Sequence, residues 1–305
     1  MSKRYSHVVV VGIDGAGAFI KNADMPAFAR IFENGAVTYD SLASNPSISA
    51  ECWGSMLTGV GPELHKLTNN IVSTQEYPQD AAFPSLFRRI RNAYPDAELG
   101  SYCDWNPITA GIIERDVGIS TDTARDTQLT PIICDYIREK KPTFLFVQFD
   151  SVDSAGHHKG YGTPGYYQRL TEVDLLVEDI HTAVKDAGML EDTLFIVISD
   201  HGGRNGEDGR GHHGGWTDGE KFVTIAATGK TVKKGTMGAA NVRDLSAIVL
   251  YALGIDIPAF DEAGWTSQIP EDLFCDDGIP AYRDISNLTG AAPRVSKVPH
   301  TSELI

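Results

Sequence analysis

The sequence predicts an α/β fold with a mainly parallel central sheet and helices on both faces. Short apolar runs, each ending in or near an acid or a glycine, cover residues 7–14, 143–150, 193–200 and 222–229. Such runs are typical of strands that are buried on both faces. Segments with helical spacing lie between them, and alternation of strands with helices gives a parallel sheet.

The segments with helical spacing cover residues 25–35, 121–141, 166–188 and 242–254. Gly35, Gly188 and Gly254 stand where the first, third and fourth of these helices are expected to end, because glycine readily adopts the conformation that terminates a helix. Pro131 starts or interrupts the second helix. These four segments can therefore cover the sheet.

Residues 71–120 fit this alternation poorly and are rich in proline, tyrosine, tryptophan and aspartate. They predict a small insertion or lid within a single domain that covers residues 1–305. The last residues, 276–305, show little periodicity, and their role stays open.

Charge and composition limit the partners of the chain. The net charge is −15, from 41 acidic and 26 basic residues, which argues against a nucleic acid polymer or an anionic membrane as partner. No window approaches the ~18 apolar residues of a membrane span, and no signal peptide is evident. The 4 cysteines form no CxxC pair, which favours reduced thiols and a cytoplasmic location.

The strongest chemical signal is the stretch SDHGGRNGEDGRGHHGG, residues 199–215. Asp200 and His201 end a predicted strand, and His212 and His213 follow among glycines. Aspartate and neutral histidine are suitable ligands for Zn²⁺ or Mn²⁺. An isolated Asp-His pair is more often a capped turn, but the two later histidines favour a metal site.

A second signal is DSVDSAGHH, residues 150–158. Asp153 and His157 are four residues apart, so one helical turn places both on one face. Asp153 as an ordinary helix cap is the alternative, and Asp150 competes with it as a ligand.

Asp14 lies between glycines at the end of the first predicted strand, in VVVVGIDGAGA. The carboxyl ends of parallel strands meet at one edge of a sheet, so Asp14 is expected near Asp153 and Asp200. Two alternatives remain open. GAGAFI resembles a dinucleotide-binding loop without its third glycine, and VGIDGAG resembles the first phosphate loop of actin-like sugar kinases.

The fourth signal is NPSISAECWGSMLTG, residues 45–59. Ser47 or Ser49 precedes a predicted helix, whose amino terminus favours a phosphate or an alkoxide, although serine is also an ordinary helix cap. The four signals together fit two metal sites with oxygen and nitrogen ligands. Two metals about 3.5–4 Å apart form a clamp for phosphoryl transfer.

These motifs resemble the alkaline phosphatase superfamily and, within it, the type I phosphodiesterase/nucleotide pyrophosphatase family. The likeness covers about residues 7–75 and 143–220. Residues that match the spacing of the family are Pro46, Ser49, Thr58-Gly59, Pro62-Glu63, His65 and Asn70. The nucleophile of the family is usually threonine, whereas Ser49 is the counterpart here, as in alkaline phosphatases. The sulfatase signature is absent.

The resemblance implies a role for each matching residue. One metal would be bound by Asp14, Ser49, Asp200 and His201. The second would be bound by Asp153, His157 and either His212 or His213, with His213 preferred because it directly precedes Gly214-Gly215. Asn70 would bind a non-bridging phosphate oxygen, and His65 would hold its loop in place.

The implied enzyme is a metal-dependent phosphoric ester hydrolase of the phosphodiesterase type with two divalent ions, Zn²⁺ first and Mn²⁺ as the alternative. Its substrate would be a small phosphoester, with nucleotides among the candidates, and Ser49 would form a covalent phospho-enzyme intermediate. A phosphomonoesterase, which the serine favours, a phosphomutase and a sugar kinase are the alternatives. The aromatic residues Tyr77, Phe83, Tyr102 and Trp105 either form a slot for a diester substituent or belong to the core.

Overall fold

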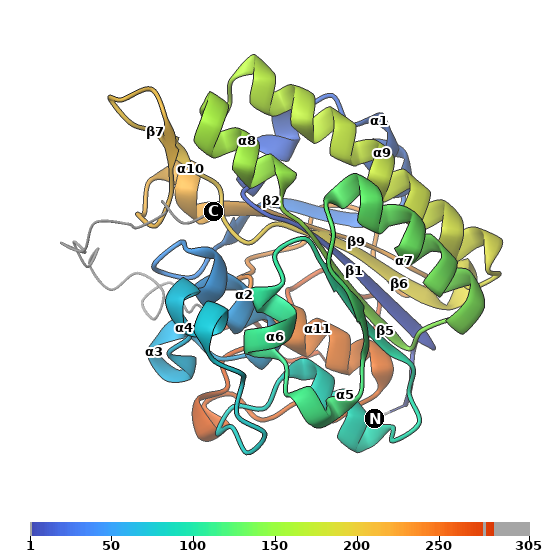
Figure 1. Cartoon of the computed structure of the whole chain (residues 1–305). Coiled ribbons are helices and arrows are strands. Elements are labelled where there is room, and N and C mark those ends of the chain that lie inside the picture. The colour runs from blue at the N-terminus through green and yellow to red at the C-terminus, as the bar shows by residue number, and fades with distance from the viewer. Residues whose placement is uncertain (1, 277–278, 284–305) are drawn as a thin grey trace.

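The computed structural model describes residues 2–276 and 279–283, and seven strands form its central sheet in the order β2-β9-β6-β1-β5-β3-β4 (Figure 1). The strands are β1 (His7–Ile13), β2 (Ala36–Leu42), β3 (Leu99–Cys103), β4 (Ser120–Asp122), β5 (Phe144–Phe149), β6 (Thr193–Ile198) and β9 (Phe222–Thr228). β1 is parallel to both β5 and β6, and β3 is parallel to β4 and β5. The expected mainly parallel α/β sheet is confirmed.

The expected strand over residues 222–229 is present as β9, but it runs antiparallel to its neighbours β6 and β2. Between β6 and β9 the chain forms only the hairpin β7 (Arg204–Asn205) and β8 (Gly211–His212) and the short helix α10 (Asp218–Lys221). A strand parallel to β6 would need a crossover that brings the chain back to the end of the sheet where β6 begins. No such crossover occurs between β6 and β9, so β9 returns in the opposite direction.

Helices cover both faces of the sheet (Figure 1). One layer contains α1 (Pro26–Ile31), α7 (Asp126–Lys140), α8 (Ser151–Lys159) and α9 (Pro164–Asp186). The other contains α2 (Ser49–Thr58), α3 (Pro62–His65), α4 (Asn69–Thr74), α5 (Leu86–Ala93), α6 (Pro107–Ile112) and α11 (Asp244–Leu253). Short 3₁₀ helices are η1 (Gly17–Asn22), η2 (Arg115–Val117), η3 (Leu190–Asp192) and η4 (Glu262–Gly264).

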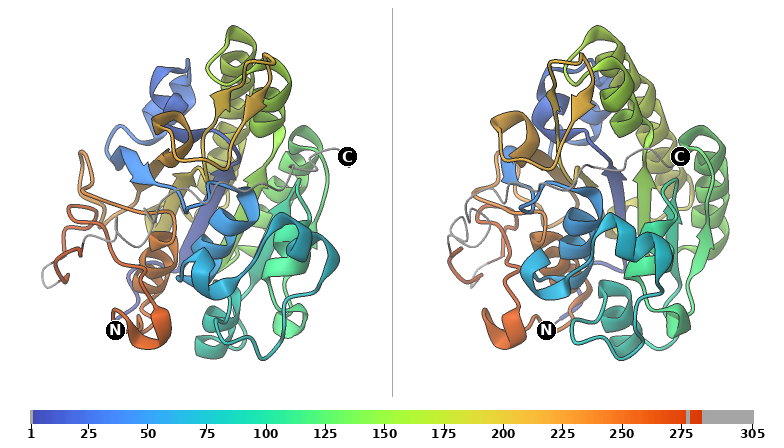
Figure 2. Two further views of the ribbon diagram at one scale, coloured as in Figure 1. Left: turned by 90° about the vertical axis from the view of Figure 1, so that its left-hand side faces the viewer. Right: turned by 60° about the vertical axis from the view of Figure 1, so that its left-hand side comes forward.

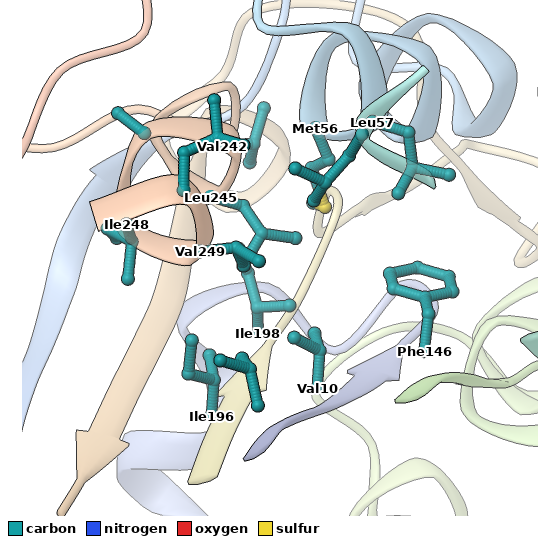
Figure 3. Close-up of a cluster of buried hydrophobic side chains, with 14 of the residues drawn as sticks. Val10, Met56, Leu57, Phe146, Ile196, Ile198, Val242, Leu245, Ile248 and Val249 are labelled. Carbon is teal, nitrogen blue, oxygen red and sulfur yellow. The ribbon is translucent and has the colours of Figure 1, made fainter. Parts of the chain in front are cut away.

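The alternation of side chains along β1 divides the core into two parts. Val8 and Val10 belong to the cluster that includes α2 and α11, whereas Val9 and Val11 belong to the cluster that includes α7 and α9. Successive side chains of a strand point to opposite faces, so an unbroken apolar run serves both layers. Figure 3 shows Val10 and Ile198 of the sheet beside Val249 of α11. This packing fixes α2, the helix that begins at Ser49, against the sheet.

The expected insertion or lid over residues 71–120 would lie outside the sheet, but these residues supply strands of it. They supply β3, which pairs with β5, and β4 begins at Ser120. Tyr77 and Tyr102 are buried in the core. The strand LGSYC is short and has no continuous apolar run, so no pattern in the sequence indicated it. Residues 277–278 and 284–305 of the C-terminal segment lie outside the described residues.

In the part of the chain that the structure describes, no helix combines the length and the apolar character that crossing a membrane requires.

Candidate active site

Five segments far apart in the sequence bring the predicted site residues to one edge of the sheet. Asp14 follows β1, and Asp200 and His201 follow β6. The remaining residues are Ser49 at the start of α2, Asp153 and His157 within α8, and His213 directly after β8. Figure 2 shows the β7-β8 hairpin beside α8 at this end of the molecule. The expected helical turn that carries both Asp153 and His157 is confirmed.

The first group of potential metal ligands is Asp153, His157 and His213, whose ligand atoms all lie within 4.8 Å of one another. Asp153 Oδ2 is 3.1 Å from His157 Nε2. His157 Nε2 is in turn 3.2 Å from His213 Nε2. One carboxylate and two imidazoles therefore point at a common centre.

The second group converges on His201 Nε2. Ser49 Oγ is 3.2 Å from this nitrogen, Asp200 Oδ2 is 3.3 Å away and Asp14 Oδ1 is 3.5 Å away. Asp14, His201 and Asp153 also have ligand atoms within 4.8 Å of one another. Asp153 thus lies between the two groups, whereas the family resemblance placed it in only one.

Hydrogen bonds fix which nitrogen of each histidine faces the site. The Nδ1 atoms of His157, His201 and His213 are each 2.9 Å from a backbone carbonyl, those of Gly211, Gly202 and Ser47. A carbonyl only accepts, so Nδ1 carries the proton in all three rings. The Nε2 atoms then present their lone pairs to the site, as metal-binding histidines do.

Asp14 is held through one of its two carboxylate oxygens. Trp53 Nε1 and Gln148 Nε2 both donate to Asp14 Oδ2, each at 3.0 Å. Gly12 leaves room for the indole, because a Cβ at that position would lie 2.5 Å from the Trp53 ring. The fold therefore fixes Oδ2 and directs Oδ1 toward His201.

Asp200 is held in the same way. Its Oδ1 accepts from the backbone N–H groups of Gly15 and His201, at 3.0 and 2.8 Å. Asp14 Oδ1 and Asp200 Oδ2 are both buried, and neither has a hydrogen-bond partner among the described residues. Buried carboxylate oxygens without a partner are costly, and a cation would supply the missing interaction.

Protonation equilibria support the same conclusion. Burial raises the pKa of Asp14 well above its usual value, and Asp200 and Asp153 add repulsion. Burial likewise raises the pKa of Asp200. For Asp153, burial also acts upward, but His213 and the hydrogen bond from His157 lower its pKa below the usual range. A cation would reverse the repulsion between the carboxylates.

Ser47 and Ser49, around the start of α2, make different contacts. Ser49 is the first residue of the helix, and its Oγ faces the second group. Ser47 instead joins the loop of His213: its Oγ donates to Gly215 O at 2.8 Å and accepts from Gly214 N at 3.0 Å. The order Ser47-Ile48-Ser49 thus places a candidate nucleophile and a loop anchor side by side.

Asn69, rather than Asn70, makes a side-chain contact beside Ser49. Asn69 Oδ1 accepts from Ala50 N at 3.0 Å. Both asparagines are exposed, and the backbone carbonyl of Asn70 accepts from Thr74. Motif spacing selected Asn70, and that role stays a prediction; the turn at Thr68, which caps α4, brings the preceding asparagine to the start of α2.

Three other candidates lie outside the two groups. His212 faces Asp208 across the hairpin, with Nε2 3.2 Å from Oδ1. Asp150 is bound through its backbone N–H to Asp126. His65 Nδ1 accepts from Leu67 N at 3.0 Å, and its Nε2 lies 3.2 Å from Glu51 O. His65 therefore holds the turn after α2, as expected.

The glycines after β1 serve packing in this fold. Gly15 has a φ of +65°, and a Cβ there would lie 2.4 Å from Asp153 Oδ1. The following helix is the 3₁₀ segment η1, not the long α-helix of a dinucleotide-binding loop. The loop VGIDGAG thus allows α8 to approach β1 and gives no support to the kinase alternative.

Sequence reasoning missed Trp53 and Gln148, although signals for both exist. Trp53 is four residues after Ser49, so it lies on the same face of the helix. Gln148 interrupts the apolar run TFLFVQFD, and a polar residue in a buried strand needs a partner. Both signals point to the site that contains Asp14.

A hydroxyl at a helix amino terminus, beside paired groups of carboxylates and imidazoles, is suited to reaction at phosphorus. The fold and the site define a phosphoester-acting enzyme of the alkaline phosphatase superfamily. The chain belongs to the type I phosphodiesterase/nucleotide pyrophosphatase family, whose family model matches residues 8–86 and 88–247.

Similarity to individual proteins is lower. GPI ethanolamine phosphate transferase 2 of Aspergillus fumigatus is 24% identical over 192 residues, or 61% of this chain and 24% of that protein. The chain thus spans about a quarter of the length of this relative. Murine ectonucleotide pyrophosphatase/phosphodiesterase 5, an inactive variant in complex with AMP, has a TM-score of 0.69 at 15% identity, covering 84% of this chain and 97% of that one. The human protein has a TM-score of 0.71 at 14% identity, covering 88% and 100%.

Proposed function

We propose that this chain is a phosphoric ester hydrolase that uses two divalent cations and Ser49 as its nucleophile. One observation carries the proposal: Ser49 Oγ, Asp200 Oδ2 and Asp14 Oδ1 all lie within 3.5 Å of His201 Nε2. A hydroxyl among ligand atoms that lack other partners is placed to be ionised rather than merely to cap a helix.

The donor set fits a pair of cations such as Zn²⁺ or Mn²⁺, with Asp14, Asp200, His201 and Ser49 as one ligand set and Asp153, His157 and His213 as the other. Such cations, when bound, stabilise an ionised nucleophile and offset charge on the phosphoryl group. The chain itself positions the attack. Ser49 is the first residue of α2, so a phosphate bonded to its oxygen would lie at the amino terminus of that helix, where the helix dipole favours an anion.

The reaction is a double displacement at phosphorus. In the first step Ser49 gives up its hydroxyl proton, its Oγ–P bond forms, the bond from phosphorus to the leaving oxygen breaks, and the leaving oxygen takes up a proton from solvent. In the second step the oxygen of water bonds to phosphorus, the Oγ–P bond breaks and Ser49 recovers its proton. Asn69, fixed through its Oδ1 to Ala50 N, has its amide N–H groups available for a non-bridging oxygen.

A transferase is the second candidate, favoured by the similarity to an ethanolamine phosphate transferase. In that reaction an alcohol takes the place of water in the second step. The first step and its residues are unchanged, so the acceptor alone distinguishes the two enzymes.

The likeness to a phosphodiesterase fold in complex with AMP supports a nucleotide-type phosphodiester as the substrate class. Comparing p-nitrophenyl phosphate with p-nitrophenyl thymidine monophosphate, each with Mn²⁺ or Zn²⁺ and with or without added ethanolamine or glycerol, tests the proposal. The diester should react faster. Faster cleavage of the monoester would indicate a phosphomonoesterase, and an alcohol adduct among the products would indicate a transferase.

The role of the nucleophile is tested by Ser49→Ala, with Ser41→Ala as the matched control. Ser41 Oγ is buried on β2 and has no partner among the described residues, so its loss should leave activity intact. Ser49→Ala should lower turnover at least about a thousandfold while metal binding is retained. Substantial activity in this variant would refute the assignment of the nucleophile.

A further inference from the structure

Tyr161, a residue that no sequence motif singled out, lies against the carboxylate shared by both ligand groups. It follows α8, is only 3% exposed, and its hydroxyl donates to Asp153 Oδ1. The other oxygen, Oδ2, faces His157 Nε2. The phenol therefore separates the two oxygens of Asp153 into one held by the protein and one directed into the site.

The ring of Tyr161 also explains several glycines of the site. A Cβ on Gly156, Gly203 or Gly211 would lie 2.5, 2.2 or 2.7 Å from this ring. Gly203 directly precedes β7 and Gly211 begins β8, in the glycine-rich stretch that precedes His213. These glycines thus permit the hairpin to lie flat against the tyrosine.

A polar clamp joins the same two segments. Tyr161 N donates to Asn205 Oδ1 at 2.8 Å, and Asn205 Nδ2 donates back to Tyr161 O at 3.0 Å. His157 Nδ1 contacts Gly211 O from the neighbouring turn of α8. Tyr161 therefore connects Asp153 on α8 with the hairpin that leads into His213.

From these contacts we propose that Tyr161 is a positioning residue that sets the affinity of both cation sites, by orienting Asp153 and by seating the hairpin before His213. The inference rests on the proposed two-cation function. The phenol that donates to Oδ1 holds the carboxylate in one orientation, with Oδ2 directed into the site. Such outer contacts typically change metal affinity by about 10–100-fold.

The test is Tyr161→Phe, which removes only the hydroxyl, with Tyr136→Phe as its matched control. Tyr136 is 6% exposed, packs against Gly100 and donates to a carboxylate, Glu98, at 3.0 Å. Both variants lose one phenol-to-carboxylate bond, but only one of them touches the site. Mn²⁺ affinity is measured by competition with a chelator, together with the melting temperature of metal-free protein.

We expect both variants to melt at a similarly reduced temperature without metal, whereas only Tyr161→Phe binds Mn²⁺ about 10–100-fold more weakly. Activity of Tyr161→Phe should be restored at high Mn²⁺ concentration, with KM for the substrate little changed. Mn²⁺ affinity within about twofold of the wild-type value would overturn the inference while the proposed function stands. A wild-type protein that binds no divalent cation would overturn both.

A second variant keeps the inference testable if Tyr161→Phe does not fold. Gly203→Ala retains the hydroxyl but pushes the ring away from the hairpin, because the new Cβ would overlap it. This variant should also weaken Mn²⁺ binding by about tenfold or more. Unchanged affinity in folded Gly203→Ala protein would contradict the positioning role.

Discussion

His157 and His213 face each other through their Nε2 atoms, 3.2 Å apart, while the Nδ1 atom of each ring is bound to a backbone carbonyl. Two lone pairs at this distance repel each other unless a proton or a cation lies between them. The hydrogen bond to Asp153 raises the pKa of His157 to about 9, whereas burial lowers the pKa of His213 to about 3. In metal-free protein at neutral pH, His157 therefore keeps its Nε2 proton, which faces both Asp153 Oδ2 and His213 Nε2.

Metal binding should release that proton. Below pH 9 a cation must displace it, so the apparent affinity should rise about tenfold per pH unit between pH 7 and 9 for one proton displaced. Mn²⁺ titrations by calorimetry in two buffers with different ionisation enthalpies would count the protons. A pH-independent affinity with no proton release would contradict the paired-histidine site.

A second prediction concerns the two neighbouring asparagines, Asn69 and Asn70. Asn69 Oδ1 accepts from Ala50 N beside Ser49, whereas Asn70 accepts from Thr74 through its backbone carbonyl. Asn69→Ala should reduce kcat/KM by about 10²–10³, the usual cost of losing a donor to a transition-state oxyanion. Asn70→Ala is the matched control and should change kcat/KM less than about threefold. The opposite result would restore the role that motif spacing assigned to Asn70.

Acid should destabilise the fold through His65. Burial lowers the pKa of His65 to about 3, below its value of about 6.5 in the unfolded chain. The unfolded chain therefore binds more protons, and the contribution of His65 is complete above pH 6.5 and lost as the pH falls toward 3.

The variant His65→Gln removes this proton uptake. Its free energy of unfolding should decline less than that of wild type between pH 7 and pH 4, by about 3 kcal/mol over the interval. Urea unfolding of metal-free protein at each pH measures the difference. Equal pH dependence in both proteins would show that His65 is not held neutral in the fold.

Patterns within single segments determined what could be predicted from the sequence. The runs that became β1, β5 and β6 are continuous and apolar, and Asp14, Asp200 and His201 mark their ends. The four-residue spacing of Asp153 and His157 required only a helix. Ser49 was placed by motif spacing, and the structure brings its hydroxyl to His201.

What the sequence did not reveal depends on contacts between segments. The short strand β3 carries glycine and serine, so it gave no strand signal. The reversed direction of β9 follows from a connection that forms a hairpin and a short helix but no crossover along the sheet. Whether Asn69 or Asn70 faces Ser49 depends on one helical turn of α4, and Tyr161 becomes meaningful only once the β7-β8 hairpin lies against α8. No local pattern encodes such contacts.

Crystals of the protein grown with Mn²⁺, with data collected at the manganese absorption edge, give the most direct test. Two anomalous peaks about 3.5–4 Å apart are predicted, one between Asp153, His157 and His213 and the other between Asp14, Asp200 and His201, with the Ser49 hydroxyl facing the second. Strong manganese peaks only on the outer surface, with no peak between these side chains, would contradict the two-cation site.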